Sequence, residues 1–432
     1  MPATVVVGLQ FGDEGKGKII DFLADRADVV IRFQGGANAG HTVQVGEELY
    51  KFHLLPSGVL RKRTLNVIGN GVVVDPAQVL AELEDLRRRG HEAPNLRISD
   101  RAHVVMPYHK ILDGLEEKAK GGLSAGTTLR GIGPCFEDKV GRFGIRMVDL
   151  IDREVLRTKL DRIVPIKQRI IQALGGSDVL DLDAIYAEYS ADGDKLEPYV
   201  ADTSAILQGQ LDREKRLLFE GAQGTHLCID HGIYPYGTSS DCVAGAAAVG
   251  AGIGPTYLDG VIGVAKAFTS RVGTGPFPTE LEGPVADHLR EKGGGEYGTT
   301  THRPRRVGWI DLVMLRMSVR VNGLSGLAVT KLDVLGGLDR VKACVGYTHR
   351  GKSVKEFPAS MRILSECEPV YREFRGWPEL SEDGWVRVAR RGRRWFPPAM
   401  KKYIAFLEDQ LRVPVRTVSV GRSRAATVGV GA

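Results

Sequence analysis

A seven-residue segment near the N-terminus combines residues that bind phosphate with one residue that could act as a base. It reads Gly12-Asp13-Glu14-Gly15-Lys16-Gly17-Lys18 and follows the apolar run Val5-Val6-Val7. A glycine-rich turn between a strand and a helix exposes backbone N–H groups, and the helix N-terminus and two lysines add positive charge. The pattern predicts a phosphate-binding loop, with a plain tight turn as the alternative.

Two residues distinguish this segment from an ordinary P-loop. Gly12 to Lys18 fits the spacing G-x-x-x-x-G-K, but Ile19 stands where such a loop carries Ser or Thr for magnesium. Asp13 is also unusual, because a bare carboxylate repels phosphate. A bound magnesium ion would remove that repulsion, and a role as proton acceptor would also explain the residue.

A second polar loop follows the next predicted strand, at residues 28–33, and runs from Gln34 to Thr42. Loops at the ends of neighbouring strands open onto one crevice in α/β sheets. Asn38 offers both a donor and an acceptor, and His41 titrates near neutral pH. A lone histidine is often structural. Beside a loop that carries an acid, however, His41 and Asp13 would form an acid–base pair.

Alternating strand and helix patterns must position these loops. A helix is expected from Lys16 to about Leu23 and another from Pro76 to Leu86. Strands are expected at residues 5–7, 28–33, 65–68, 217–219, 261–264, 327–329 and 415–418. No strong linker interrupts the pattern, so we expect a single catalytic domain over residues 1–432, with a mostly helical insertion at about 147–212. The fold class is therefore α/β.

Composition narrows the class of protein only slightly. The chain has 432 residues, 43% hydrophobic and 26% charged, which is typical of a soluble globular protein. A net charge of +6 is compatible with a protein that binds small polyanionic ligands and also with a nucleic-acid-binding protein. No basic run is interleaved with aromatic residues as a single-strand platform requires, so we expect no nucleic-acid partner. The basic cluster at 390–394 is interpreted as a solvated surface.

The cysteines and the apolar segments predict a cytoplasmic location. The five cysteines form no C-x-x-C pair, which indicates a reducing compartment and argues against structural zinc. The N-terminal apolar run is too short for a signal peptide. No stretch has the length and apolarity of a membrane span, so no membrane partner is expected.

Further motifs follow in an order that resembles the adenylosuccinate synthetase family. These motifs are Gly126-Thr127-Thr128, Arg130–Pro134, Phe219–Thr225, Asp230-His231-Gly232, Thr238-Ser239-Ser240, Arg271–Glu280, Thr299-Thr300-Thr301, Arg303–Arg306 and Thr330–Leu335. The resemblance implies a large, mostly parallel central β-sheet with helical subdomains. It also implies a GTP-dependent ligase that joins IMP to L-aspartate through 6-phosphoryl-IMP, releasing GDP and phosphate, in the first committed step from IMP to AMP.

The resemblance gives four residues catalytic roles. Asp13 matches the base that removes the purine N1 proton, and His41 matches the acid that stabilises charge moving onto GDP. Lys16 should neutralise the transferred phosphoryl group, and Gln223 should hydrogen-bond the purine N1/O6 edge. Mg²⁺ is the implied cofactor, held by the Asp13 carboxylate and the Gly40 backbone carbonyl.

Three sets of substrate-binding residues follow from the same resemblance. For GTP they are Gly12, Asp13, Glu14, Gly15, Lys16, Gly17, Lys18, Gly40, His41, Thr42, Arg305, Lys331, Leu332, Asp333, Ser419, Val420 and Gly421. For IMP they are Asp13, Asn38, Ala39, Gly40, His41, Thr128, Arg142, Gln223, Thr238, Val272 and Arg303. For aspartate they are Thr299, Thr300, Thr301, Arg303 and Arg305. Arg142 matches an arginine that crosses from a partner subunit, which implies a homodimer.

Several residues depart from the family pattern near the expected pockets. They are Phe11, Leu129, Cys228, Gly237, Asp241, His302, Val420, Arg422 and Ser423. The alternative they leave open is a specialised paralogue with the same phosphoryl-activation chemistry and a different amine or nucleotide. A non-catalytic regulator would be expected to lose Asp13 or His41, and a GTPase switch protein would want Ser or Thr at position 19.

Overall fold

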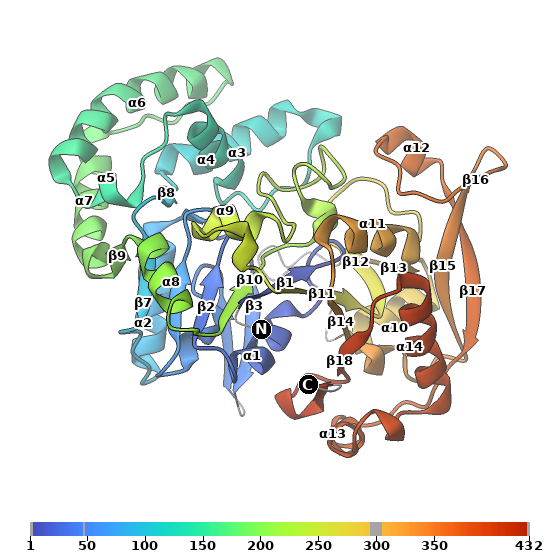
Figure 1. Cartoon of the computed structure of the whole chain (residues 1–432). Coiled ribbons are helices and arrows are strands. Elements are labelled where there is room, and N and C mark those ends of the chain that lie inside the picture. The colour runs from blue at the N-terminus through green and yellow to red at the C-terminus, as the bar shows by residue number, and fades with distance from the viewer. Residues whose placement is uncertain (1–2, 46–47, 294–304, 430–432) are drawn as a thin grey trace.

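A ten-stranded sheet forms the centre of the molecule in a computed structural model, which describes residues 3–45, 48–293 and 305–429 (Figure 1). From edge to edge the strands are β19 (Thr427–Gly429), β18 (Val415–Ser419), β14 (Gly326–Thr330), β11 (Gly260–Lys266), β1 (Ala3–Gly8), β10 (Leu217–Glu220), β2 (Val29–Arg32), β5 (Leu65–Ile68), β7 (Leu96–Ser99) and β9 (Val200–Ala201). Only the β18–β19 pair is antiparallel. The predicted α/β fold with a mostly parallel sheet is confirmed.

The strands are apolar because both faces of the sheet are covered, as is usual for parallel sheets. On one face, Ile19 and Ile20 of α1 (Lys16–Ala24) pack with Val6 and Val30. The other face packs against α8 (Thr203–Leu211), α9 (Ala246–Ala251) and α11 (Leu312–Asn322). Each of the seven predicted strand segments coincides with or overlaps a strand of this sheet.

The helix starts also follow the sequence. Helix α1 begins at Lys16, directly after Gly15, whose φ of 80° requires the left-handed conformation that glycine tolerates. Helix α2 (Pro76–Arg88) begins at Pro76, the position at which a missing N–H costs nothing. Thus a glycine and a proline mark the two predicted helix starts.

A group of helices lies at the upper left of Figure 1, above the sheet, with α3 reaching toward the middle of the molecule. They are α3 (Pro107–Ala119), α4 (Ile132–Gly141), α5 (Met147–Leu150), α6 (Arg153–Ala173) and α7 (Leu182–Leu196). The stretch at 147–212 holds α5 to α8, but it also contributes β9 to the central sheet. The division into domains stays a prediction.

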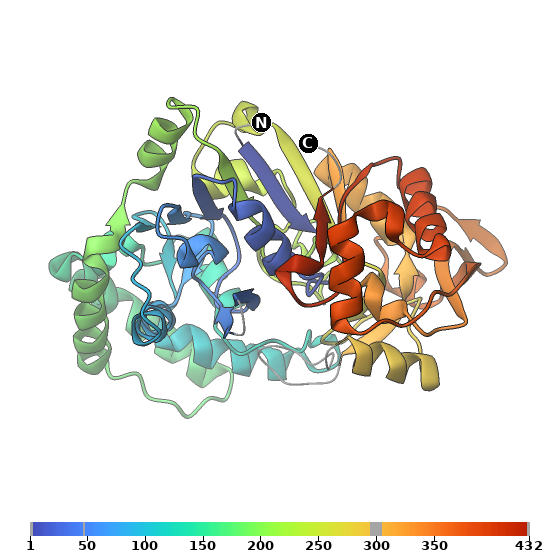
Figure 2. The ribbon, with the colours of Figure 1, turned by 90° about the horizontal axis from the view of Figure 1, so that it is seen from below.

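Smaller sheets complete the architecture. One contains β12 (Phe268–Arg271), β13 (Arg306–Asp311), β15 (Arg340–His349), β16 (Lys352–Val354) and β17 (Glu368–Arg375). Helix α10 (Pro284–Lys292) contacts β13, α14 (Pro398–Leu411) contacts β17, and Leu364 of α12 (Met361–Ser365) packs with Tyr347 of β15. Helix α13 (Glu382–Arg391) contacts β19 of the central sheet. Two pairs stand apart, β3 (His41–Val45) with β4 (Glu48–Phe52) and β6 (Val73–Val74) with β8 (His103–Val104). Figure 2 shows helices α6 and α7 on one side of the central strands and the orange and red C-terminal segment on the other side.

None of the helices formed by residues 3–45, 48–293 and 305–429 combines the length and apolarity that a membrane crossing needs.

A buried ion cluster ties α3, α4 and α6 together. Asp138 lies between His109 and Lys167, with His109 Nε2 2.9 Å from Asp138 Oδ2 and Lys167 Nζ bonded to Oδ1. His109 Nδ1 accepts the Met106 N–H, so Nε2 carries the proton that is donated to Asp138. Burial opposes the charge of Asp138, but the bonds from His109 and Lys167 hold the pKa of this carboxyl below its usual value.

Replacing Asp138 with alanine should therefore destabilise the fold strongly. The change leaves the Lys167 ammonium buried without its partner, which typically costs about 3–5 kcal/mol. Urea unfolding followed by circular dichroism measures the loss. Asp161→Ala is the matched control, since its ion pair with Arg157 is solvent-exposed and worth below about 1 kcal/mol. If both variants lost the same free energy of unfolding, the buried cluster would not stabilise the fold more than a surface ion pair does.

Candidate active site

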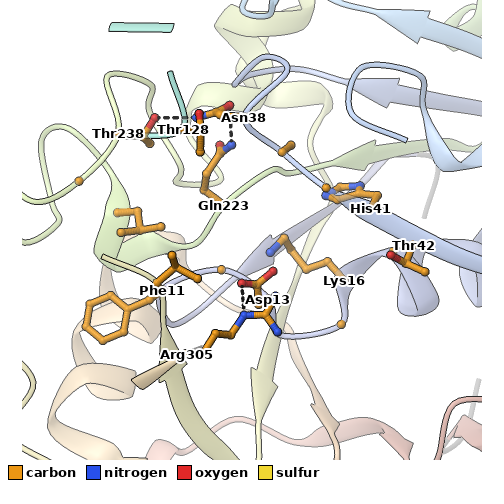
Figure 3. Close-up of a pocket in the computed structure, with 18 of the residues that line it drawn as sticks. Phe11, Asp13, Lys16, Asn38, His41, Thr42, Thr128, Gln223, Thr238 and Arg305 are labelled. Atoms are coloured by element: carbon orange, nitrogen blue, oxygen red, sulfur yellow. Dashed lines mark hydrogen bonds and ion pairs between the residues drawn. The ribbon is translucent and has the colours of Figure 1, made fainter. Parts of the chain in front are cut away.

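A cavity of about 790 Å³ runs along the carboxyl ends of the central parallel strands. Its walls come from the loops that follow β1, β2, β10, β14 and β18. Ligands bind at this end of α/β sheets, because the loops there converge and helix N-termini point at them. Figure 3 shows Asp13, Lys16 and His41 around one opening, with Asn38, Thr128, Gln223 and Thr238 gathered nearby.

Glu14 holds the N-terminal loop in shape from beneath. Its carboxylate is fully buried and accepts the N–H groups of Gln10 and Gly12, each at 3.0 Å. The same carboxylate accepts a 2.6 Å hydrogen bond from Lys16 Nζ. Glu14 does not line the cavity, whereas Lys16 does. Glu14 thus positions the ammonium group of Lys16, and its predicted contact with GTP stays a prediction.

Asp13 projects into the cavity from a strained backbone. Its φ is 59°, in the left-handed region that only a minority of non-glycine residues occupies. Its side chain is 32% exposed and forms an ion pair with Arg305, whose Nε lies 3.0 Å from Oδ2 (Figure 3). Strain of this kind concentrates at functional sites, where the surrounding structure enforces it.

His41 is paired with Glu220 behind the cavity wall. Its Nδ1 bonds Glu220 Oε1, which leaves Nε2 as the other ring nitrogen. Ser57 also donates to this carboxylate, from its N–H at 2.8 Å and its hydroxyl at 2.9 Å. Burial lowers the pKa of His41, while the negative charge of Glu220 opposes that shift. The carboxylate therefore fixes the orientation of the ring and stabilises its protonated form.

Asn38, Gln223 and Thr238 form a chain of hydrogen bonds across the cavity. Asn38 Nδ2 donates to Thr238 Oγ1 at 3.2 Å, and Gln223 Nε2 donates to Asn38 Oδ1 at 3.0 Å. Gln223 also has a positive φ of 52°, and its Oε1 is buried without a hydrogen-bond partner in the described part of the chain. An unpartnered buried acceptor beside a cavity is suited to a ligand N–H.

Lys18 and Asp333 also line the cavity. Lys18 Nζ donates to Ser419 Oγ at 2.6 Å and to the Gly421 carbonyl at 2.7 Å. Burial lowers the pKa of Lys18 to about 8, against the effect of Asp333 and Glu382. Burial also raises the pKa of Asp333, whose Oδ1 has no hydrogen-bond partner among the described residues. Asp333 therefore offers an acceptor to a ligand.

Most of the predicted ligand-binding residues line this one cavity. They are Gly12, Asp13, Gly15, Lys16, Gly17, Lys18, Asn38, Ala39, Gly40, His41, Thr42, Thr128, Gln223, Thr238, Val272, Arg305, Lys331, Asp333, Ser419 and Gly421. Leu332 and Val420 are buried beside it without lining it. Arg142 is exposed at the end of α4 and does not line the cavity of its own chain. Thr299, Thr300, Thr301, His302 and Arg303 lie outside the described residues.

The cavity offers one carboxylate suited to a magnesium ion whose other ligands come from a phosphate-bearing ligand and water. Mg²⁺ is usually held by one or two carboxylates together with substrate phosphates and water. Asp13 supplies a carboxylate that lines the cavity, and Gly40 lines the same cavity. The described ranges contain no group of three or more His, Cys, Asp or Glu side chains suited to a metal. Phosphate oxygens would therefore have to complete the coordination.

The departures from the family pattern fall at several places around the cavity. Phe11, Cys228, Gly237 and Arg422 line it. Leu129 is 56% exposed and has a φ of 57°, where the family pattern has glycine. A branched residue in this conformation costs about 1–2 kcal/mol, and nothing in its contacts explains the choice of leucine.

Sequence reasoning missed Glu220 as a site residue. It ends β10 within an apolar strand, and that position was the available signal, because a carboxylate at the carboxyl end of a central strand faces the ligand crevice. Its partner His41 is 179 residues away in sequence, so the pairing itself required the structure.

Comparisons with known proteins identify a family for the sequence and the overall fold. Residues 5–428 match the family model described as adenylosuccinate synthetase. The chain is 53% identical to the adenylosuccinate synthetase of Caldanaerobacter subterraneus subsp. tengcongensis and 52% identical to that of Carboxydothermus hydrogenoformans, with 99% of each chain covered in both cases. The structure of fully ligated adenylosuccinate synthetase from Plasmodium falciparum is similar over 100% of both chains, with a TM-score of 0.93 and 37% identity.

Proposed function

The chain belongs to the adenylosuccinate synthetase family, and from this membership we propose which of its residues carry out each part of the family's reaction. The enzyme is a GTP-dependent ligase that joins IMP and L-aspartate into adenylosuccinate, with GDP and phosphate as the other products. IMP is activated as 6-phosphoryl-IMP before the amine attacks. The observation that supports the assignment best is that Asp13, Lys16 and His41 line one cavity together with Gln223 and Asp333.

Asp13 is the general base in this assignment. The IMP base would bind beside Gln223, whose unpartnered Oε1 accepts a hydrogen bond. Asp13 takes the N1 proton, so negative charge develops on O6 and this oxygen becomes the nucleophile. The ion pair with Arg305 orients the carboxylate toward the cavity. Arg305, with Arg303 and Thr299 to Thr301, would recognise the two carboxylates of aspartate, for which guanidinium groups are suited.

Lys16 and His41 stabilise the phosphoryl group during transfer. Phosphoryl transfer depends mainly on positioning and on stabilising charge, so preorganised donors matter most. Glu14 holds the Lys16 ammonium in place, and Glu220 holds the His41 ring. A proton on His41 Nε2 can then be donated to oxygen on the GDP side. Mg²⁺, held by Asp13 and Gly40, would neutralise charge on the phosphates when bound.

Asp333 selects guanine over adenine in this cavity. A carboxylate accepts the N1 and N2 hydrogens of guanine together, and adenine does not offer this pair of donors. Asp333→Ala should therefore reduce the preference for GTP over ATP, measured as the ratio of kcat/KM values, by about one to two orders of magnitude. Asp339→Ala is the control, because that side chain is exposed and forms no hydrogen bond among the described residues. Equal use of GTP and ATP by the unmodified enzyme would contradict this role.

We also propose a homodimer that works in the cytoplasm. Arg142 is exposed on its own subunit, so it is available to reach the IMP phosphate in the cavity of a partner. Thr238, Asn38 and Thr128 would hold the same phosphate from within the chain. The five cysteines are all free, which supports a reducing compartment.

The assay that tests the function combines IMP, GTP, Mg²⁺ and a panel of amines. Aspartate should be the amine consumed, GDP and phosphate should form in equal amounts, and mass spectrometry should identify adenylosuccinate. Product formation with a different amine in preference to aspartate would overturn the assignment.

A further inference from the structure

The loop from Ser124 to Gly131 carries Thr128 into the cavity but has little backbone support of its own. In the part of the chain that the structure describes, none of the N–H groups of residues 125–131 donates to a backbone carbonyl. Buried or half-buried backbone donors need partners, so their bonds must go elsewhere. The loop lines the cavity through Ala125 to Thr128.

Two carboxylates of helix α3 accept three of these N–H groups. Glu117 Oε1 accepts the N–H groups of Gly126 at 2.5 Å and Thr127 at 3.1 Å. Asp113 accepts the Thr127 hydroxyl at 2.9 Å through Oδ1 and the Gly131 N–H at 2.9 Å through Oδ2. The two acids are four residues apart, so they lie on one face of α3, toward the loop.

The Thr127 hydroxyl extends this arrangement to the strained residue of the loop. While it donates to Asp113, its oxygen accepts the Leu129 N–H at 3.3 Å. Leu129 has a φ of 57°, so its backbone would relax if it were not held. Thr128 stands between these two anchored residues. Its own hydroxyl forms no hydrogen bond within the described ranges and faces the cavity (Figure 3).

The opposite side of the loop is confined by close contacts. Thr274 Oγ1 donates to the Ser124 carbonyl at 2.6 Å. Beside it, Gly273 has a φ of 94°, and a Cβ atom there would lie 2.7 Å from the Ala125 carbonyl oxygen. The loop is therefore held between α3 and the turn that contains Thr274, with the half-buried Thr128 in its middle.

We propose that Asp113 and Glu117 are positioning residues for the 5′-phosphate of IMP, acting through the backbone that presents Thr128. This inference rests on the proposed binding of that phosphate at Thr128. Bonds to ionised carboxylates are stronger than neutral ones, so the two acids stabilise the loop conformation that presents Thr128. A loop already fixed in the bound geometry costs less ordering on binding, and this raises affinity.

The test compares Glu117→Ala and Glu117→Gln with the matched control Glu116→Gln. Glu116 lies next to Glu117 on α3, and its side chain forms no hydrogen bond or ion pair among the described residues. KM and kcat are measured for IMP, GTP and aspartate, with IMP affinity by calorimetry and Tm by thermal unfolding. Glu117→Ala should raise KM and Kd for IMP by about tenfold or more. Glu117→Gln should give a smaller rise, and Asp113→Asn should resemble it.

The KM for GTP, the kcat and the Tm should change little in these variants. If the two acids only stabilised the fold, their loss would lower the Tm and affect all three substrates. Equal IMP affinity in Glu117→Ala and the unmodified enzyme would overturn the inference, and so would a parallel rise in KM for IMP and GTP. Failure of the proposed function is distinct, because it shows as absence of adenylosuccinate even where IMP binds. An unmodified enzyme that binds no IMP would overturn both.

Discussion

Asp13→Asn is expected to abolish turnover while leaving the fold intact. An amide cannot accept the N1 proton of IMP, and loss of a general base alone costs roughly 10²- to 10⁴-fold in rate. The amide is also a weaker magnesium ligand than a carboxylate. Asparagine tolerates the left-handed conformation that Asp13 adopts at φ 59°, so the loop should keep its shape. Initial rates of GDP release measure the effect.

Asp25→Asn provides the matched control for this variant. Asp25 ends the helix that the Asp13 loop opens, and its side chain is 71% exposed in an ion pair with Arg61. The same chemical change there should leave the rate nearly unaffected. Calorimetry should show that Asp13→Asn still binds IMP, because Asn38, Thr128 and Thr238 are untouched. Near-normal turnover of Asp13→Asn would exclude Asp13 as the base.

The central sheet was predictable from the sequence because its strands are buried on both faces. Such strands are mainly apolar in sequence, and the predicted segment Leu65 to Ile68, in which only Asn66 is polar, coincides with β5 residue for residue. The start of α1 was predictable for a different reason, since Gly15 permits the left-handed turn that directs Lys16 into a helix. Both signals are local in sequence.

The orientation of individual side chains in the site could not be predicted in the same way. Glu14 belongs to the phosphate-loop motif, yet its carboxylate points beneath the loop and supports Gln10, Gly12 and Lys16. A sequence motif predicts which residues form the loop, but it does not predict which of their side chains point toward the ligand. The pairing of His41 with Glu220 depends on the adjacency of β2 and β10, which only the folded sheet establishes.

Two inactive variants, Arg142→Leu and Asp13→Ala, should restore activity when their subunits are mixed and allowed to exchange. Asp13 lines the cavity of its own chain, whereas Arg142 is exposed and lies outside that cavity. A two-fold dimer with a shared site would place both defects in one site of the heterodimer and leave the other site complete. Random exchange makes half of the dimers mixed, so recovery should approach roughly a quarter of the unmodified rate.

The control pair for complementation is Asp13→Ala with His41→Asn. Asp13 and His41 line the cavity of the same chain, so each site of their heterodimer lacks one catalytic group and no activity should return. Recovery by the Arg142 pair and not by the control pair would therefore require that Arg142 act across the subunit boundary. If mass spectrometry shows exchanged subunits and the Arg142 pair stays inactive, then Arg142 makes only a surface contact and the shared site is excluded.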